Sequence, residues 1–183
     1  SVSLIPISAF QYCKKLTELN LPSSINSIEN SAFMGCSSLT SFNSPSCLTR
    51  IGNSAFQDCN LLNEVSFSDS LNSIGNSAFK GCVGLSAIQI PNGIVAINDS
   101  TFYGCSSLSQ ITNINQISSV GNSSFENCTS LESMEFENLQ SIFNSAFKNC
   151  SALTNIDLGN KLTSLGDYAM ANCSRLTKME IPG

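Results

Sequence analysis

The sequence predicts an α/β solenoid of about eight turns, in which each turn contributes a strand and a short helical segment. Three observations point to this fold class. A cysteine returns every 23 residues, a leucine follows each of these cysteines three positions later, and a phenylalanine precedes nearly every one by three positions. A fixed period between about 20 and 50 residues is the signature of stacked supersecondary units. We therefore expect residues 1–183 to form a single solenoid domain.

The period is regular except for one step of 22 residues, between the sixth and the seventh cysteine. The cysteines are Cys13, Cys36, Cys59, Cys82, Cys105, Cys128, Cys150 and Cys173. The leucines are Leu16, Leu39, Leu62, Leu85, Leu108, Leu131, Leu153 and Leu176. The aromatic position holds Phe10, Phe33, Phe56, Phe79, Phe102, Phe125 and Phe147, with Met170 in the last turn.

The first half of each period predicts a strand. In the copy from Leu85 to Pro91, apolar and polar residues alternate near its end, which is the period of a strand. Each strand must pair with its copy one turn later in the same direction, so we expect a parallel sheet. The pair Leu71 and Ile74 could form a second extended stretch, and the sequence leaves that point open.

The second half of each period predicts one short helical turn. An asparagine such as Asn53 precedes Ser-Ala-Phe in most copies and could cap the start of a helix. Before the cysteine stands Gly, Asn or Asp in nearly every copy, residues that tolerate a left-handed backbone at a helix end. Tyr12 is the exception. A pure parallel β-helix, in which each turn contains only extended segments, is the alternative.

The Cys and Phe positions are expected to form a structural core, one rung per turn. Its predicted members are Cys36, Cys59, Cys82, Cys105, Cys128, Cys150, Phe33, Phe56, Phe79, Phe102, Phe125 and Phe147. A column of cysteines with one member per turn is unlike a tetrahedral zinc site, and parallel side chains are poorly placed for disulfides. We therefore expect buried free thiols, with Cys47, which lies outside the column, exposed.

Composition argues against several functions. The chain contains no histidine, so no Ser-His-Asp or Cys-His arrangement can form, and we expect no enzyme, catalytic residue, metal or cofactor. The net charge of -5 and the lack of a basic cluster argue against nucleic-acid binding. No apolar run approaches the roughly 18 residues of a membrane helix, so this segment is not expected to insert into a membrane.

A binding surface is predicted where polar residues alternate with the inward strand positions. In solenoids such residues line an extended concave face that binds partners. The predicted concave face consists of Glu18, Asn20, Ser41, Asn43, Glu64, Ser66, Gln89, Gln110, Thr112, Glu135, Asn155, Asp157, Lys178 and Glu180. It lacks the aromatic and arginine anchors of strong binding hot spots, so we expect weak binding per repeat.

The motif L-x-x-hydrophobic-x-hydrophobic-P, followed by I-G-x-x-A-F-x-x-C, resembles the BspA-like leucine-rich repeats, also called the Treponema pallidum type. Leu62 to Cys82 carries it almost residue for residue. The resemblance implies a leucine-rich-repeat solenoid with a parallel sheet on its concave face and short helical turns on its convex side. It also implies a non-enzymatic protein-binding module of a cell-surface or extracellular protein, which acts in adhesion to host matrix or cell-surface proteins.

Two further expectations follow from the repeat. The ladder of unpaired thiols favours an alternative, a cytoplasmic leucine-rich-repeat scaffold for protein–protein interaction, because a reducing compartment tolerates free thiols. The chain starts and stops at matching phases of the period, which predicts a fragment of a longer array. Its terminal turns carry no polar cap, so we also expect end-to-end self-association or fraying.

Overall fold

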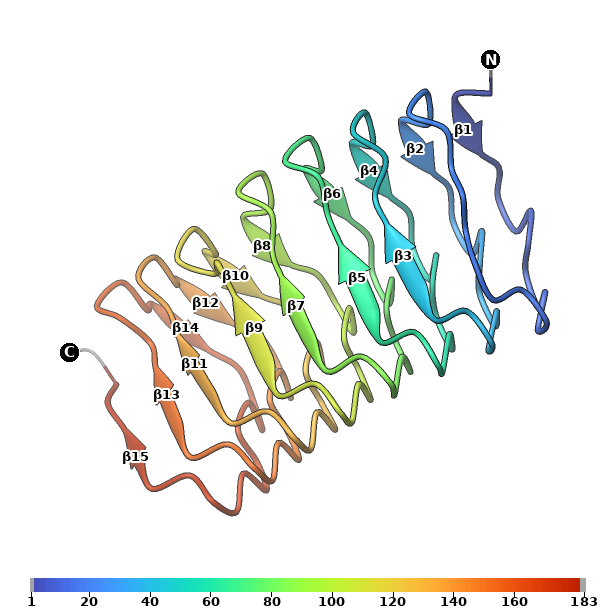
Figure 1. Cartoon of the computed structure of the whole chain (residues 1–183). Helices are drawn as coiled ribbons and strands as arrows, with labels where there is room; N and C mark the ends of the chain where they lie inside the picture. The colour runs from blue at the N-terminus through green and yellow to red at the C-terminus, as the bar shows by residue number, and fades with distance from the viewer. Residues whose placement is uncertain (1, 182–183) are drawn as a thin grey trace.

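The chain forms a solenoid of stacked turns (Figure 1). The structure is a computed structural model and describes residues 2–181. Each turn passes through two extended segments and one tightly folded segment. The coil therefore has three sides, which we call the long-strand face, the short-strand face and the turn side. The parallel solenoid of about eight turns is as predicted, but residues 2–181 contain no helix, so the predicted helical turns are wrong.

The long-strand face consists of strands that follow the leucine of each repeat. They are β3 (Ser41–Asn43), β5 (Glu64–Ser66), β7 (Ala87–Gln89), β9 (Gln110–Thr112), β11 (Ser133–Glu135), β13 (Asn155–Asp157) and β15 (Lys178–Met179). Paired strands run parallel and in register, so that Ile88 lies beside Ile111. The central residue of each strand points inward, and its two neighbours point to solvent.

The short-strand face consists of a second row of strands. The pair Leu71 and Ile74 and its copies therefore do form a second extended stretch in each turn. The strands are β1 (Leu4–Ile5), β2 (Ser27–Ile28), β4 (Arg50–Ile51), β6 (Ser73–Ile74), β8 (Ala96–Ile97), β10 (Ser119–Val120), β12 (Ser141–Ile142) and β14 (Ser164–Leu165). They too are parallel and in register across the 22-residue step, where Val120 pairs with Ile142.

The 22-residue step is absorbed outside both sheets. The loop between Phe136 and Leu139 holds two residues, whereas the corresponding loop between Phe67 and Leu71 holds three. Phe136 and Leu139 are both buried, so the shorter loop keeps the inward positions of the turn in place. A deletion in a surface loop leaves the strand register intact, as expected where no core contact depends on the loop.

The interior is a set of columns in which each repeat position stacks on its copy. The largest column is a row of phenylalanine rings from Phe10 to Phe147, with neighbouring centroids 5.2 to 5.8 Å apart and ring planes within 16° of parallel. From Phe33 to Phe147 these rings are 0% exposed. Burial of such large apolar side chains dominates the energy of a core.

The turn side shows why no helix forms. In the turn that contains Phe56, two residues four positions apart have a left-handed backbone, Ser54 with φ 54° and Asp58 with φ 58°. Left-handed L-residues cannot continue a right-handed helix. The N–H groups of Ser54, Phe56 and Asp58 instead donate to carbonyls of the next turn, at 2.8, 2.8 and 2.7 Å. The third side is thus another inter-turn hydrogen-bond ladder.

The asparagine that precedes Ser-Ala-Phe also bonds between turns and does not cap a helix. Asn30 Oδ1 accepts the backbone N–H of Asn53 at 2.8 Å, and Asn53 Oδ1 accepts that of Asn76 at 2.9 Å. Each side chain therefore satisfies a backbone donor of the following turn, which would otherwise lack a partner. The residue before the cysteine is left-handed as predicted, and Tyr12 adopts the same conformation with φ 60°.

The two terminal turns present apolar side chains to solvent. Val2, Ile7 and Tyr12 are exposed at one end, and Tyr168 and Ile181 are exposed at the other. In a stacked array each turn is covered only by its neighbours, so a terminal turn has one uncovered side. End-to-end self-association and fraying remain predictions of the sequence.

Among residues 2–181, one buried side-chain oxygen lacks a hydrogen-bond partner. Ser124 stands in the column that elsewhere holds alanines such as Ala78, is 0% exposed, and its Oγ makes no hydrogen bond. We predict that Ser124→Ala raises the free energy of unfolding by about 1–3 kcal/mol, the cost of an unsatisfied buried hydroxyl. Urea unfolding followed by circular dichroism measures this.

Thr101 provides the control, because it occupies the same column and its hydroxyl donates to the Asn98 carbonyl at 2.8 Å. Thr101→Ala removes a satisfied hydrogen bond and should not stabilise the chain. A Ser124→Ala variant less stable than the parent would contradict the prediction.

Candidate functional site

The long-strand face is built by the outward residues of its strands, and the structure places all fourteen predicted binding residues with side chains directed away from the core columns. Twelve of them are exposed, while Ser41 and Asn155 are half-buried. The face is continuous along the coil because each outward residue lies beside its counterpart on the next strand. Glu135, for example, pairs in register with Asp157.

Within the described residues, the first turn lacks a strand on the long-strand face. Glu18 and Asn20 are exposed, but residues 16–21 are not part of a strand. The inward neighbours Leu16, Leu19 and Leu21 are only half-buried. The ordered part of the face therefore begins at β3.

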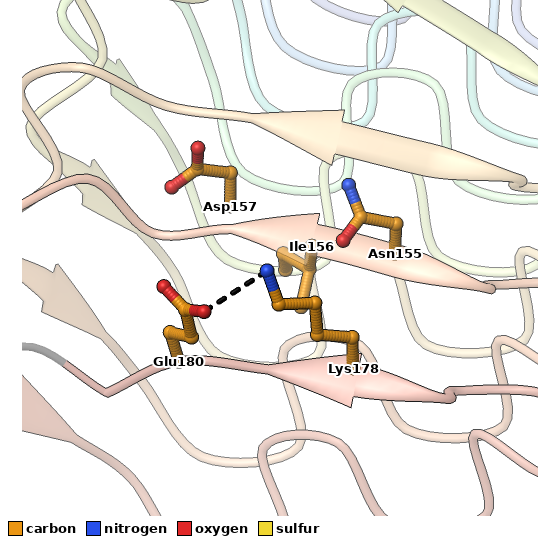
Figure 2. A pocket seen from close by; sticks show the side chains of 5 residues that line it. All are labelled: Asn155, Ile156, Asp157, Lys178 and Glu180. Carbon is orange, nitrogen blue, oxygen red and sulfur yellow. Dashed lines mark ion pairs between the residues drawn. The ribbon is translucent and has the colours of Figure 1, made fainter.

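Charge on the face gathers toward its C-terminal end. Glu135, Asp157 and Glu180 occupy the same outward position in three successive turns. Figure 2 shows Asp157 on β13 and the pair of Lys178 and Glu180 on the next turn, with Lys178 Nζ 2.9 Å from Glu180 Oε1. The hydrogen bond from Lys178 to Glu180, with the nearby Asp157 carboxylate, raises the pKa of Lys178. Glu180 is thus partly neutralised, whereas Glu135 and Asp157 have no cation in an ion pair among residues 2–181.

The middle of the face is hollowed, and the outward residues of β7 and β9 there carry no charge. One hollow of ≈ 200 Å³ lies over β5 and β7, between Ser66, Gln89 and Asn113. A second of ≈ 360 Å³ lies over β9 and β11, between Thr112, Asn115 and Ser133. Both are shallow, and their polar walls are mostly hydroxyl and amide groups, which can donate and accept hydrogen bonds. One carboxylate lines each of them, Asp69 in the first and Glu135 in the second.

The cysteine column forms hydrogen bonds that the repeat pattern did not predict. From Cys36 onward each thiol donates to the backbone carbonyl of the phenylalanine one turn earlier, as in Cys59 Sγ to Phe33 O at 3.2 Å and Cys82 Sγ to Phe56 O at 3.1 Å. Burial raises the pKa of the Cys82 and Cys105 thiols well above the ordinary value. The strict return of cysteine, in place of another small apolar residue, was the only signal of this bond.

All nine cysteines are free, and six of them are buried. Cys47 is exposed, but so is Cys13 in the first turn, where an inward position was expected, because no preceding turn covers it. Buried thiols of raised pKa are inert as nucleophiles and metal ligands. The column is a structural element of the core.

No group of three or more His, Cys, Asp or Glu residues within 2–181 is arranged to hold a metal ion. The same stretch has no helix that is long and apolar enough to cross a bilayer. What the face does offer is an extended row of exposed polar side chains on a rigid support.

Comparison with known sequences identifies a repeat family. The sequence profile described as "BspA type Leucine rich repeat region" matches residues 1–94 and 72–183, in six copies. The two matches together span the chain. No curated protein matches it.

Solved structures share the fold, among them two leucine-rich-repeat proteins. The leucine-rich-repeat protein of T. pallidum superposes with a TM-score of 0.79 at 28% identity, over 86% of this chain and 76% of that one. A leucine-rich-repeat protein from Bacteroides ovatus superposes with a TM-score of 0.51 at 23% identity, over 99% of this chain and 70% of that one. The second likeness concerns the fold alone.

Proposed function

Since the chain belongs to the BspA-type leucine-rich-repeat family, we propose that it is a non-enzymatic protein-binding module, which acts in adhesion at the cell surface through its long-strand face. Its partner is a host matrix or cell-surface protein. The observation that carries this proposal is the contrast between the inward and outward positions of the same strands. Inward residues repeat from turn to turn, whereas outward neighbours change from Glu64 to Ala87 to Gln110.

Packing explains only half of that contrast. Inward side chains must fit the copies above and below them, so their type is constrained. Outward side chains are free to vary, and solenoids use such surfaces to bind partners over many repeats. The face has no aromatic or arginine anchor, so each turn supplies little binding energy and several copies bind more tightly than one.

We predict that the chain binds immobilised matrix proteins such as collagen or fibronectin weakly as a single copy. Four copies held on streptavidin through a C-terminal biotin should bind about a hundredfold more tightly, through avidity. Biolayer interferometry measures both. A tetramer that binds no better than the monomer, or no binding to any matrix protein, contradicts the adhesion proposal.

A matched pair of variants locates the binding surface. Gln110→Arg places a bulky charge in the middle of the long-strand face, whereas Gln140→Arg makes the same change at an exposed position beside β12 on the short-strand face. The first substitution should weaken binding of the tetramer and the second should not. Equal effects of both would place the partner elsewhere on the coil.

The nine free cysteines support a second candidate function, an intracellular scaffold for protein–protein interaction. Free thiols persist most easily in a reducing compartment. Protease treatment of intact source cells separates the two candidates, because a surface protein is digested and an intracellular one is protected.

A further inference from the structure

The long-strand sheet is not continuous. Its hydrogen-bonded strands form three groups, which are β3 with β5, β7 with β9, and β11 with β13 and β15. The sheet is therefore interrupted twice, between β5 and β7 and between β9 and β11. The interruptions lie on either side of β7 and β9, whose outward residues are uncharged, and one hollow is found at each of them.

A local change of backbone accompanies the second interruption. At the end of β9, Asn113 takes the place of the apolar residue found at Ile90 and Phe136, and its backbone is left-handed with φ 57°. Its Nδ2 donates to the Ile90 carbonyl at 2.6 Å and to Asn92 Oδ1 at 2.9 Å. The next residue, Ile114, then points inward and is 6% exposed. The chain thus leaves β9 along a different path from that of its neighbours.

At the first interruption an inward residue becomes accessible. Val65 is only half-buried, whereas its counterparts Ile88 and Met134 are 3% and 2% exposed. Val65 lines the hollow with Ser66 and Gln89. A further shallow depression, lined by Val65, Ala87 and Gln110, continues from it across β7 toward β9. This depression shares Val65 and Gln89 with the first hollow and Thr112 with the second, so the three lie side by side along the middle of the face.

The lining of this groove defines what fits it. Along its middle the exposed side chains are Ser66, Gln89, Gln110, Thr112 and Ser133, which carry no charge and offer both donors and acceptors. One carboxylate, Asp69, lines the hollow at the β5 end. Ala87 keeps the groove open because it is the smallest outward side chain of the face. Such a lining matches the alternating N–H and C=O groups of an extended backbone. At the other end, Glu135 on β11 and Asp157 on β13 lie side by side and favour a positive charge.

We propose that the groove across β5, β7, β9 and β11 binds an extended segment of a partner polypeptide, made of uncharged polar residues and followed by a basic residue over Glu135 and Asp157. The inference rests on the proposed function and names its partner chemistry. Four strands about 4.8 Å apart span about 14 Å, which corresponds to four or five extended residues. The basic residue completes the segment by meeting the two carboxylates.

Selection from a displayed library of random seven-residue peptides on the 183-residue chain tests the proposal. The enriched sequences should consist of uncharged polar residues with Lys or Arg toward one end. A synthetic peptide of the consensus is then titrated against the parent and two matched variants, Thr112→Arg in the groove and Thr163→Arg at an exposed position beside β14. Thr112→Arg should weaken the affinity at least tenfold, and Thr163→Arg should leave it unchanged.

The double variant Glu135→Gln with Asp157→Asn tests the contact with the basic residue of the peptide. This variant should bind the peptide more weakly, and its affinity should depend much less on salt concentration. Enrichment of acidic or aromatic peptides, no enrichment, binding of glycans instead of peptides, or full affinity in Thr112→Arg would each overturn the proposal. If the tetramer binds matrix proteins while the chain enriches no such peptide, the groove assignment fails and the proposed function stands.

Discussion

Replacement of Phe79 by alanine is expected to lower the free energy of unfolding by about 3–5 kcal/mol, the usual cost of deleting a buried aromatic ring. Phe79 is 0% exposed, and its ring stacks at 5.4 Å on Phe56 and at 5.8 Å on Phe102. Phe67 meets its edge at 5.8 Å. The cavity would lie in the middle of the array, where each turn depends on both neighbours. Urea unfolding followed by circular dichroism measures the loss.

Phe143→Ala is the matched control, since that ring is 47% exposed and lies outside the stack. Its removal should change the free energy of unfolding by no more than about 0.5 kcal/mol, as for most surface substitutions. If the Phe79 variant unfolded at the same urea concentration as the parent, the ring column could not be the main source of stability.

The second large effect is expected in the reactivity of the thiols. Cys13 and Cys47 are exposed and should react with a maleimide at once in the folded chain, followed by the half-buried Cys173. The six buried thiols should react about a hundredfold or more slowly, since they must be uncovered by local opening. Burial raises the pKa of Cys82 and Cys105, so little thiolate forms at these sites near neutral pH. Peptide mapping after timed quenching measures the nine rates.

Urea provides the internal reference, because all nine thiols should react at similar rates once the chain is unfolded. Rapid labelling of Cys82 or Cys105 in the folded chain would contradict the buried column. Fewer than nine reactive thiols after unfolding would contradict the assignment of free cysteines.

The inward positions were predictable from sequence because they are dictated by repetition. Leu85, Ile88 and Phe79 stand at fixed distances from Cys82, and all are buried in the structure. A side chain that must stack on its own copy keeps the same type in every turn, so periodicity alone identifies it. The parallel direction of the strands follows from the same constraint.

The prediction of a helical turn was wrong because the residues that suggest a helix are equally compatible with a turn that bonds to its neighbouring turns. Asn before Ser-Ala-Phe is typical of a helix cap, yet Asn53 bonds to Asn76 in the next turn. A left-handed residue before Cys59 is typical of a helix end, yet Ser54 is left-handed too, and nothing in a serine signals this. A seven-residue segment is too short to form a stable helix by itself, so hydrogen bonds to neighbouring turns decide its conformation.

The sequence by itself determined the period, the parallel stacking, the buried columns and the membership of the outward row, because each depends on residue type at a repeated spacing. Only the tertiary structure decided the all-β turn, the thiol bonds to Phe carbonyls, the exposure of Cys13 and the two interruptions of the long-strand sheet. Those features depend on contacts between turns. Asn113, for example, replaces an apolar residue of the repeat and has a left-handed backbone. The residue pattern alone does not show how the neighbouring strands pair around it.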